Sequence, residues 1–444
     1  MSGSQPQTPP ARRLAVLTFG CKVNQYESAY MVEQAVTAGW RLADPEAADL
    51  LVINSCTVTS RADRQVRQAL RQAGRRHSPS PIVVTGCYAQ RSPAELASFP
   101  GVRAVLGNAA KTSWLEVASH LPPDGQPCLR LTDMAACRSF QPMPISHFQG
   151  HTRAFVKIQD GCSQNCTYCI VPTVRGPERS LPPDQVLSQL QTLVQHGSGE
   201  LVLTGINLSR YGQDLPDSPS LATLCRALKK SGWPARLRLS SLEPQDLSLQ
   251  LLQELAAWPQ FCPHFHIPLQ SGADAVLRAM HRSYDAAWFA DLVQQIVAWF
   301  PSAAIGLDVL VGFPTETPAD FAQTRDLLAR LPLTYLHVFP YSPRPHTPAA
   351  QLRPRNDRRQ IETWARELRA LAADKKQAFY QRHLGQIVEV LVEGALPGQP
   401  GLITGLTANY LRVHCPGPAA WAKQIIRVKL SKLAGGALFG LPVS

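Results

Sequence analysis

Three cysteines lie within eight residues near the middle of this 444-residue chain, directly after a predicted strand. Cys162, Cys166 and Cys169 form the pattern CxxxCxxC, and Tyr168 stands just before the third cysteine. Thiolates on a short loop are the usual ligands of iron–sulfur clusters. Three ligands leave one iron of a four-iron cluster open, and an open position separates a catalytic metal site from a closed structural one. The loop therefore predicts a catalytic cluster.

Structural zinc is the alternative interpretation of these cysteines. A structural zinc site takes four nitrogen or sulfur ligands, commonly as two short pairs. The chain contains no second CxxC, and the nearest candidate histidine, His151, lies on the far side of the predicted strand 154–159. The ligand count therefore favours an iron–sulfur cluster.

Strand and helix patterns alternate through the N-terminal part of the chain. Short apolar runs at 14–20, 49–54 and 81–86 predict strands, and helical patterns lie between them at 27–38 and 61–74. Such alternation is typical of a parallel sheet with right-handed crossovers. We therefore predict an α/β fold for this region.

A cysteine follows each of these strands at once or within two residues: Cys21, Cys56 and Cys87. Ligands of an open α/β sheet bind outside the carboxyl ends of its strands, so the three cysteines are expected to converge there. One cysteine in such a place is more often a small buried apolar residue. Three in equivalent positions predict a second three-cysteine site, built from three loops.

The helix predicted at 61–74 carries a row of arginines on one face. Steps of three and four place Arg61, Arg64, Arg67, Arg71 and Arg75 side by side. A solvated face is the usual interpretation of such a row. An anionic partner is the alternative, because only Asp63 lies among these charges to offset their repulsion.

A second series of strands and helices follows residues 121–150, which we predict to be a linker because of their Pro and Gly content. The cysteine loop comes directly after the first strand of this series, as expected for a barrel with its chemistry at the carboxyl ends of the strands. The predicted strands cover 154–159, 201–204, 236–240, 263–267, 304–311 and 334–339. The predicted helices cover 183–196, 219–230, 248–257, 285–298 and 318–330.

The C-terminal region is basic and rich in short strands. Residues 355–380 predict a charged helix, and from 384 onward strands with Gly and Pro turns predict a small β-barrel. Net charge is +12, and residues 353–444 hold 14 Lys and Arg against 6 Asp and Glu. Such a bias favours nucleic acid as the partner, and small barrels bind it in looped or single-stranded form. Charge and stacking are expected from Tyr410, Arg412, Lys423, Arg427 and Lys429.

Composition argues against secreted and membrane proteins. No apolar run approaches the roughly 18 residues of a spanning helix. The polar residues 1–11 resemble neither a signal nor an anchor, so we predict a disordered lead there. Eleven cysteines in a chain of this length do not form the pattern of a disulfide framework. We expect a cytoplasmic monomer without a membrane partner.

Four motifs resemble those of the methylthiotransferases, a family of radical S-adenosylmethionine (SAM) enzymes. Three are N-terminal, GCKVNQYES (20–28), NSCTVT (54–59) and TGCYAQ (85–90), and the fourth is KIQDGCSQNCTYCIVP (157–172). The resemblance covers nearly all of residues 12–441. It implies three domains in order. These are an N-terminal methylthiotransferase domain at 12–120, a partial six-stranded (βα)6 radical SAM barrel with a bridging helix at 151–380, and an RNA-binding TRAM barrel at 381–444.

The resemblance implies two [4Fe-4S] clusters and SAM as cofactors. Cys162, Cys166 and Cys169 would hold the catalytic cluster that cleaves SAM, and Cys21, Cys56 and Cys87 would hold an auxiliary cluster that delivers sulfur. Strand ends corresponding to LTGINLSRYG (203–212), LSSLEP (239–244), HIPLQSG (266–272) and DVLVGFPTET (308–317) would line the SAM pocket. The implied contacts are Tyr168, Thr204, Gly205, Asn207, Ser241, Glu243, Gln270 and Asp308.

The family divides by substrate into branches that modify isopentenyladenosine in tRNA, a ribosomal protein aspartate, or N6-threonylcarbamoyladenosine in tRNA. GCKVN, TGCYAQ and LHVFPYSPR (336–344) look most like the third branch, although His346 stands where that pattern has Gly. The resemblance thus implies methylthiolation at C2 of the modified adenosine at position 37. We expect Arg344 to grip the carboxylate of the threonylcarbamoyl group, because Arg can form two parallel hydrogen bonds to it.

The expected partners are the anticodon loop of tRNA, an electron donor such as flavodoxin or ferredoxin, and a sulfur donor. The alternatives are a methylthiotransferase of either other branch and a non-catalytic, metal-stabilised RNA-binding protein.

Overall fold

The computed structural model describes residues 12–75, 80–122, 126–148 and 150–443, so the disordered lead predicted at 1–11 lies outside it. The chain forms two compact units. Unit 1 contains the residues up to Cys137 together with 141–145 and 173–176. Unit 2 contains 138–140, 146–172 and everything from Pro177 onward.

Unit 1 is built on a six-stranded parallel sheet in the order β2-β1-β3-β4-β5-β6. Its strands are β1 (Arg13–Thr18), β2 (Arg41–Leu42), β3 (Leu50–Ser55), β4 (Ile82–Gly86), β5 (Val102–Leu106) and β6 (Cys128–Arg130). Its helices are α1 (Lys22–Thr37), α2 (Ser60–Gly74), α3 (Cys87–Arg91), α4 (Pro93–Ala97) and α5 (Trp114–Ser119). The predicted α/β alternation is confirmed.

Unit 1 differs from the sequence prediction in several details, and β2, β5, α3, α4 and α5 were not predicted. Helix α1 begins at Lys22, five residues before the predicted start at 27, because Cys21 takes the extended N-cap conformation directly after the β1 turn. Strand β6 lies within the segment predicted as a linker, where it pairs with β5. That prediction missed β6 because three residues among prolines and glycines carry no periodicity.

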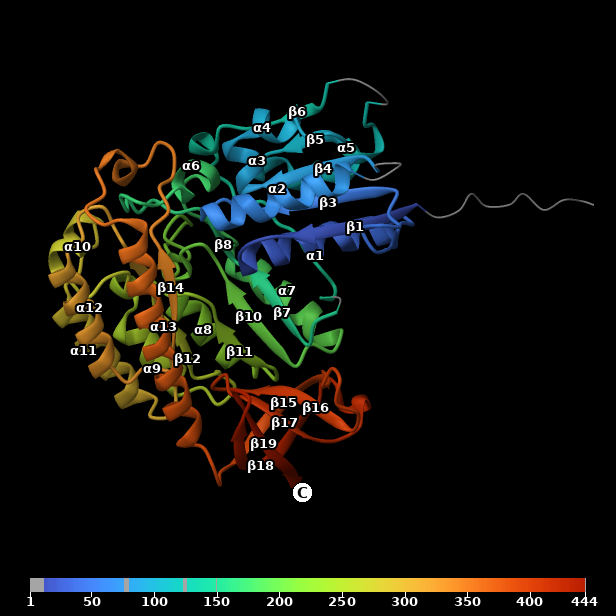
Figure 1. The fold of residues 1–444 in the computed structure, drawn as a ribbon. Helices are drawn as coiled ribbons and strands as arrows, with labels where there is room; N and C mark the ends of the chain where they lie inside the picture. The colour runs from blue at the N-terminus through green and yellow to red at the C-terminus, as the bar shows by residue number, and fades with distance from the viewer. Residues whose placement is uncertain (1–11, 76–79, 123–125, 149, 444) are drawn as a thin grey trace, which may run out of the picture. The chain divides into compact units, whose positions relative to one another are not determined.

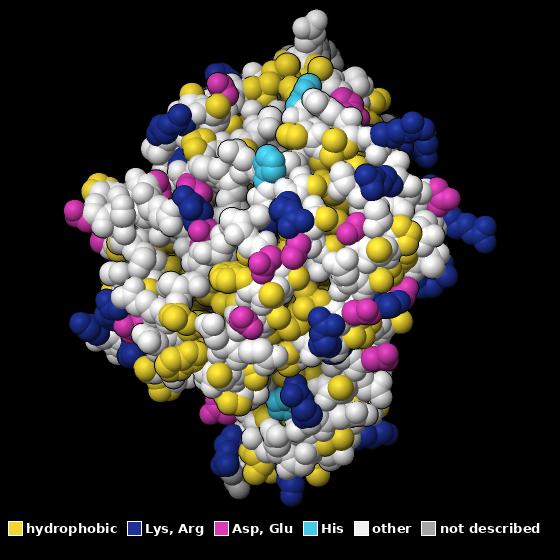
Figure 2. Space-filling view, turned by 90° about the vertical axis from the view of Figure 1, so that its left-hand side faces the viewer, with side chains coloured by type: hydrophobic (Ala, Val, Ile, Leu, Met, Phe, Trp, Pro, Cys, Tyr) yellow, Lys and Arg dark blue, Asp and Glu magenta, His cyan; other side chains and the backbone are white. Residues whose placement is uncertain are grey.

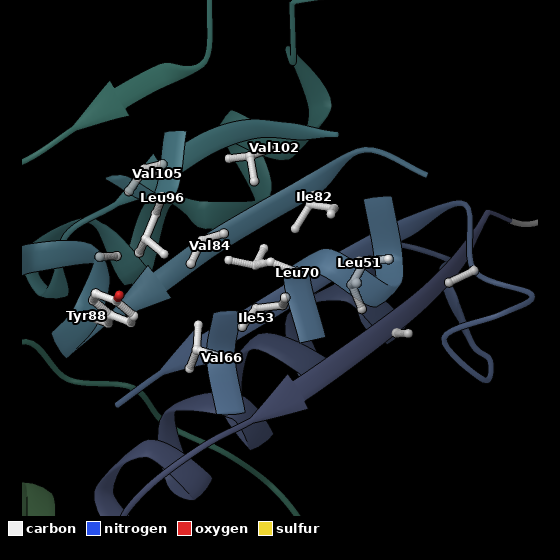
Figure 3. Packing of buried hydrophobic residues seen from close by; sticks show 14 residues of the cluster. Leu51, Ile53, Val66, Leu70, Ile82, Val84, Tyr88, Leu96, Val102 and Val105 are labelled. Atoms are coloured by element: carbon white, nitrogen blue, oxygen red, sulfur yellow. The ribbon is translucent and has the colours of Figure 1, made fainter. Parts of the chain in front are cut away.

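Side chains from the strands and α2 point toward one another in the core of unit 1 (Figure 3). Val66, Leu70 and Ala73 recur at helical spacing on α2 and are fully or almost fully buried. They pack with Ile53 and Val84 of the two central strands. This core holds the carboxyl ends of β3 and β4 in fixed register, which positions the residues that follow them.

Unit 2 contains six parallel strands in two three-stranded sheets, β11-β10-β7 and β12-β13-β14. Single bridges, Leu237 to Phe261 and Ser241 to His266, link the two sheets into one partial barrel. The strands are β7 (Arg153–Lys157), β10 (Glu200–Thr204), β11 (Arg236–Leu239), β12 (His264–His266), β13 (Ala304–Val311) and β14 (Tyr335–Pro340). Strands β8 (Gln159–Asp160) and β9 (Arg179–Ser180) form a separate antiparallel pair.

Helices lie on the outer side of these strands (Figure 1). They are α7 (Pro183–Gln195), α8 (Leu221–Lys230), α9 (Leu249–Ala256), α10 (Asp274–Ala279), α11 (Ala286–Trp299) and α12 (Pro318–Arg330). The short helix α6 (Val171–Arg175) begins in unit 2 and ends in the 173–176 segment of unit 1. The predicted partial (βα)6 barrel is therefore confirmed, with α10 as an additional helix.

The long helix α13 (Arg358–Gln381) leads into a closed five-stranded barrel in the order β15-β16-β17-β19-β18. Its strands are β15 (Ile387–Ala395), β16 (Leu402–Thr407), β17 (Arg412–Pro416), β18 (Ile425–Ala434) and β19 (Ala437–Val443). The small β-barrel predicted from 384 onward is confirmed and is consistent with a TRAM domain. Among the described residues, no helix combines the length and apolar character that crossing a bilayer requires.

Candidate iron–sulfur sites

The loop with the three clustered cysteines is anchored at both ends in unit 2. Gly161 takes φ +73°, a conformation that favours glycine, and its N–H donates to Oδ1 of Asp160 at 2.9 Å. Near the other end, the backbone N–H of Thr167 donates to the Met280 carbonyl at 3.2 Å, and its hydroxyl donates to the Ala279 carbonyl at 2.8 Å. The chain between these anchors is therefore fixed to the end of α10.

The three cysteines of this loop are half-buried. Burial raises the pKa of both Cys162 and Cys169 to about 12, and the neighbouring thiols add to the shift. The backbone N–H of Gln164 donates to Cys162 Sγ at 3.4 Å. Because a metal binds thiolates, loading this site would release protons from these cysteines.

An arginine that the sequence did not single out contacts the loop. Nη1 of Arg282 donates to Cys166 Sγ at 3.4 Å, and Nη2 of Arg282 pairs with Glu243. Burial raises the pKa of Glu243, while Arg282 opposes that shift. Glu243 was expected at a strand end of the SAM pocket, and the structure places it beside the cysteine loop through this arginine. No periodicity or motif distinguishes Arg282 in the sequence.

The strand end expected to contact SAM lies next to the cysteine loop. A Cβ atom at Gly205 would stand 2.8 Å from Oε1 and 2.9 Å from Cβ of Gln159, so only glycine fits there. The Gln159 side chain accepts from the Asn207 backbone at 2.8 Å and donates to the Gly161 carbonyl at 2.8 Å, tying this strand end to the loop. Thr204, the last residue of β10, is buried.

Asn207 gives a test of whether a cofactor fits here. Its Oδ1 is buried and has no hydrogen-bond partner among the described residues. A buried acceptor without a partner costs about 1–3 kcal/mol, which an incoming donor would recover. An amino group of a ligand chelated by the loop supplies such a donor, so the residues present fit a three-cysteine cluster with SAM.

The other residues expected to contact SAM differ in their surroundings. The Tyr168 ring packs in an apolar cluster with Phe313 and Tyr341, and burial raises its pKa well above the usual range. Ser241 bridges the two sheets, and Gln270 has φ +68° and pairs with Val309 of β13. Asp308 contacts two histidines of the neighbouring strands. Direct contact between these residues and SAM stays a prediction.

In unit 1 the structure brings together the three cysteines that follow the strands. Cys21 caps α1 after β1, Cys56 follows β3, and Cys87 begins α3 after β4. Burial, reinforced by the Cys87 and Cys21 thiols, raises the pKa of Cys56 to about 12. Gly20 is needed for this approach, because a Cβ atom there would stand 2.6 Å from Cys56 Cβ and 2.9 Å from its Sγ.

A buried charge network surrounds Cys87. Arg175 is 1% exposed, and its Nε donates to Cys87 Sγ at 3.3 Å. The same guanidinium donates to Oε1 of Glu27 at 3.0 Å and to Oδ1 of Asn24 at 2.7 Å. Lys111, fully buried, pairs with the other oxygen of Glu27, and burial lowers its pKa. Asn108 Nδ2 lies 3.7 Å from Cys87 Sγ.

This network fits an anionic group at the cysteines. One carboxylate faces two basic side chains, so the surroundings of the three thiols carry an excess of donors and of positive charge. Oδ1 of Asn108 is buried without a partner among the described residues. Buried charged groups are normally paired or coordinate a metal. Hydrogen-bond donors to ligating thiolates orient those ligands and adjust the properties of the metal site. The residues present therefore fit an auxiliary cluster.

Two of the residues expected to contact RNA or its modified base are engaged within unit 2. Arg344 is 4% exposed and donates to Ser342 Oγ at 2.8 Å and to the Pro343 carbonyl at 3.0 Å. His346 has φ +63°, so the position where the family pattern has Gly keeps the left-handed turn. The Tyr410 ring stacks on the His264 ring, with 4.4 Å between the two ring centroids.

The remaining expected RNA contacts lie on the surface of the C-terminal barrel. Arg412 is half-buried and pairs with Glu393, whereas Lys423, Arg427 and Lys429 are exposed on or next to β18. Lys and Arg side chains are spread singly over the face shown in Figure 2, with Asp and Glu among them. RNA contact through these three residues stays a prediction.

Comparison with known proteins identifies the family. The model of the uncharacterized protein family UPF0004 matches residues 13–107, which contain the three strand-end cysteines. The model of the radical SAM superfamily matches residues 156–328, which contain the cysteine loop. The computed structure is similar to that of TsrM from Kitasatospora setae, a radical SAM methyltransferase. The TM-score is 0.53, with 14% identity, and the match covers 77% of this chain and 75% of that one. At this identity the match shows that the two proteins share a fold.

Curated relatives match over nearly the whole chain. Threonylcarbamoyladenosine tRNA methylthiotransferase MtaB from Bacillus subtilis is 35% identical over 94% of both chains. MtaB from Aquifex aeolicus is 37% identical over 91% of this chain and 97% of its own. tRNA-2-methylthio-N(6)-dimethylallyladenosine synthase from Thermus thermophilus is 34% identical over 97% of this chain and 91% of its own. With two cysteine sites on a radical SAM fold and identity at this level, the chain belongs to the methylthiotransferase family of radical SAM enzymes.

Proposed function

We propose that the protein transfers a methylthio group to C2 of N6-threonylcarbamoyladenosine at position 37 of tRNA, using SAM and two [4Fe-4S] clusters. The observation that carries the proposal is the presence of two separate three-cysteine sites, one at the radical SAM loop and one at the strand ends of unit 1. The MtaB names of several relatives support the choice of base.

Each site has its own task in this proposal. When bound, the cofactors supply one-electron cleavage of SAM to a carbon radical in unit 2 and a sulfur-bearing iron in unit 1. Cys162, Cys166 and Cys169 hold the first cluster, Arg282 orients Cys166, and the Asn207 side chain receives a donor of SAM. Cys21, Cys56 and Cys87 hold the second cluster, and Arg175 donates to Cys87.

The substrate base is reached through the anticodon loop. Loops of RNA present unstacked bases that a protein can enter, whereas the deep major groove of A-form RNA excludes side chains. The exposed Lys423, Arg427 and Lys429 would neutralise phosphates. Arg344 is the proposed partner of the threonylcarbamoyl carboxylate, for which it would exchange its bond to Ser342 Oγ.

A second candidate has dimethylallyladenosine as its base, because synthases with that name are 34% identical over most of the chain. The two substrates differ in a carboxylate, so one experiment separates them. The reconstituted enzyme is given, in parallel, tRNA that carries threonylcarbamoyl, tRNA that carries dimethylallyl, and unmodified tRNA, and the nucleosides are analysed by mass spectrometry. We expect product only from the first. Equal turnover of the threonylcarbamoyl tRNA and the dimethylallyl tRNA would contradict the proposed choice of base.

Two further measurements test the rest of the proposal. Nucleoside analysis of tRNA from a deletion strain should show loss of the methylthio product. Loss of a methylthio group from ribosomal protein instead would favour the branch that modifies a ribosomal protein aspartate. Iron analysis of the anaerobically reconstituted protein should give about eight irons, as two four-iron clusters require. Zinc without iron would support a non-catalytic RNA-binding protein. Flavodoxin or ferredoxin is the proposed reductant, and a separate sulfur donor replaces the transferred atom.

A further inference from the structure

Three metal-binding side chains lie on neighbouring strands of unit 2, outside both cysteine sites. His266 ends β12, Asp308 lies in β13, and His337 lies in β14. Asp308 pairs directly with His337 across β13 and β14, and His266 pairs with Gly306, two residues before Asp308. Because alternate residues of a strand share a face, all three side chains point to the same side of this sheet.

The three side chains converge on one point. Oδ1 of Asp308 lies 3.0 Å from Nε2 of His266 and 3.1 Å from Nδ1 of His337. The three atoms all lie within 4.8 Å of one another. Ligands with bonds of about 2.1 Å at near-right angles stand about 3 Å apart, so the two short distances equal those of neighbouring ligands on one metal ion.

A second layer of side chains holds His266 in place. Its other ring nitrogen, Nδ1, lies 3.2 Å from the hydroxyl of Tyr335, which lies 2.8 Å from Nε2 of His264. Tyr335 can sit there only because residue 306 is glycine, since a Cβ atom at that position would stand 1.9 Å from Cζ of the ring. A metal-bound histidine typically uses its second nitrogen in this way, which fixes the ring and its tautomer.

The arrangement is closed on one side and open on the other. The side chain of His266 is 10% exposed, that of Asp308 is 22% exposed and that of His337 is 53% exposed. Three protein ligands with an open side leave positions for water or another oxygen ligand.

We propose that His266, Asp308 and His337 bind one divalent transition-metal ion, in addition to the iron–sulfur clusters. Two imidazoles and one carboxylate suit iron(II), zinc or manganese, and this ligand set with open positions is typical of mononuclear sites. Asp308 then serves the ion rather than SAM. The ion requires neither the proposed substrate nor the auxiliary cluster, so the inference stands apart from the proposed function. The alternative is that Asp308 only accepts hydrogen bonds from the two imidazoles.

The test uses the reconstituted enzyme with its clusters, treated with a chelator and desalted. Mn²⁺ is added under anaerobic conditions, and the free ion is followed by its electron paramagnetic resonance signal. The test variant is His337→Asn, whose exposed position makes loss of folding a small risk. The matched control is His196→Asn, which removes an exposed histidine at the end of α7. Tyr335→Phe probes the second layer. Iron content and circular dichroism verify that each variant is folded and loaded.

We expect the wild type and His196→Asn to bind one equivalent of Mn²⁺ in competition with Zn²⁺. His337→Asn should weaken binding at least tenfold, and Tyr335→Phe should weaken it about tenfold, as outer-shell changes commonly do. The proposal is overturned if the wild type binds no ion in excess Mn²⁺, or if His337→Asn binds as tightly as the control.

Discussion

The two cysteine sites of this protein are assembled in different ways. In unit 2 one loop of eight residues supplies all three thiols, and anchors at Gly161 and Thr167 fix that loop. In unit 1 the thiols come from the ends of three separate strands and meet only when the sheet has formed. The first site depends on local chain geometry. The second depends on the integrity of a whole domain and on Arg175, which comes from a distant segment.

The largest expected effect separates the chemistry of the two sites. Cys162→Ala should reduce reductive cleavage of SAM to background and abolish product, because it removes a ligand of the cluster that supplies the electron. Cys56→Ala should retain 5′-deoxyadenosine formation and lose only the methylthio product. Both variants are assayed anaerobically with dithionite, with chromatography of 5′-deoxyadenosine and nucleoside mass spectrometry.

Two outcomes would contradict this separation of tasks. A Cys56→Ala protein that retains its loop cluster but makes no 5′-deoxyadenosine would show that the sites do not act separately. A Cys162→Ala protein that still forms the product would remove the catalytic role of the loop. Cys225→Ala, which changes a buried cysteine of α8 away from both sites, is the matched control.

The next largest effect tests how far unit 1 depends on its distant arginine. Arg175→Met removes one of the two basic partners of the buried Glu27 carboxylate and leaves Lys111 as the other. A hydrogen bond to a charged group contributes about 1.5–3 kcal/mol, so unit 1 should lose at least that much stability. Hydrogen exchange of the β1, β3 and β4 amides, followed by mass spectrometry, should show this loss in unit 1. The radical SAM barrel should keep its protection.

Two companion variants sharpen the result. Arg175→Lys retains the charge but cannot reproduce the donor geometry, so it should fall between the wild type and Arg175→Met. Arg175→Met combined with Glu27→Gln should be less stable than the single variant, because the buried Lys111 then loses its carboxylate. A double variant more stable than the single one would contradict the charge argument.

Buried glutamates in the two units provide a smaller contrast. Glu27 has two basic partners, whereas the buried Glu316 of unit 2 accepts mainly from the backbone N–H of Gly312. Burial raises the pKa of Glu316 to about 7 from its usual value of 4.5. Between these two values the folded protein keeps a proton that the unfolded chain releases. Stability therefore falls as pH rises through this window, and the loss is complete above pH 7.

Glu316→Gln should remove this slope. Relative to the wild type, the variant should gain up to about 3 kcal/mol as pH rises from about 4.5 to about 7, as the width of the window implies. Urea unfolding at pH 5 and pH 8, followed by circular dichroism, measures the difference. An equal pH slope in both proteins would show that Glu316 is not the group responsible.

The smallest expected effect compares two basic surfaces. Lys423→Ala with Lys429→Ala should weaken tRNA binding severalfold and lower the slope of log K against log salt by up to about 2, since each lost phosphate contact removes about one unit. Arg61→Ala with Arg64→Ala changes two exposed arginines of α2 in unit 1 and should have little effect. The reverse result would place the RNA on α2.

The sequence predicted what depends on local pattern. Strand ends could be located from apolar runs, so the sequence alone could place Cys21, Cys56 and Cys87 at one edge of a sheet. Arg175 could not be assigned to unit 1, because nothing in CIVPTVRG tells which unit its side chain enters. Arg282 and Tyr335 lack a motif for the same reason, since their roles arise only from contacts between separate strands and loops.

Other differences arise from tertiary packing. Tyr410 was expected to stack on a base because it lies in a basic barrel, but the ring packs against His264 of the larger barrel. Arg344 was expected to grip the carboxylate of the modified base, and the loop after β14 buries its side chain in the absence of that base. Composition and spacing indicate which residues can bind a partner. Burial decides which of them face solvent, and no local pattern reports that.

The segment 173–176 also has a consequence for the order in which the protein matures. Unit 1 is contiguous up to residue 137. Its buried Glu27 and Cys87, however, form hydrogen bonds with Arg175, which is much later in the sequence. During synthesis from the N-terminus, the ribosome must translate the whole cysteine loop 162–169 before that arginine exists. A nascent or truncated chain ending before residue 173 therefore holds the three thiols without Arg175, and Glu27 is left with Lys111 alone. If unit 1 takes up a cluster as proposed, we expect its insertion to follow translation of the radical SAM motif.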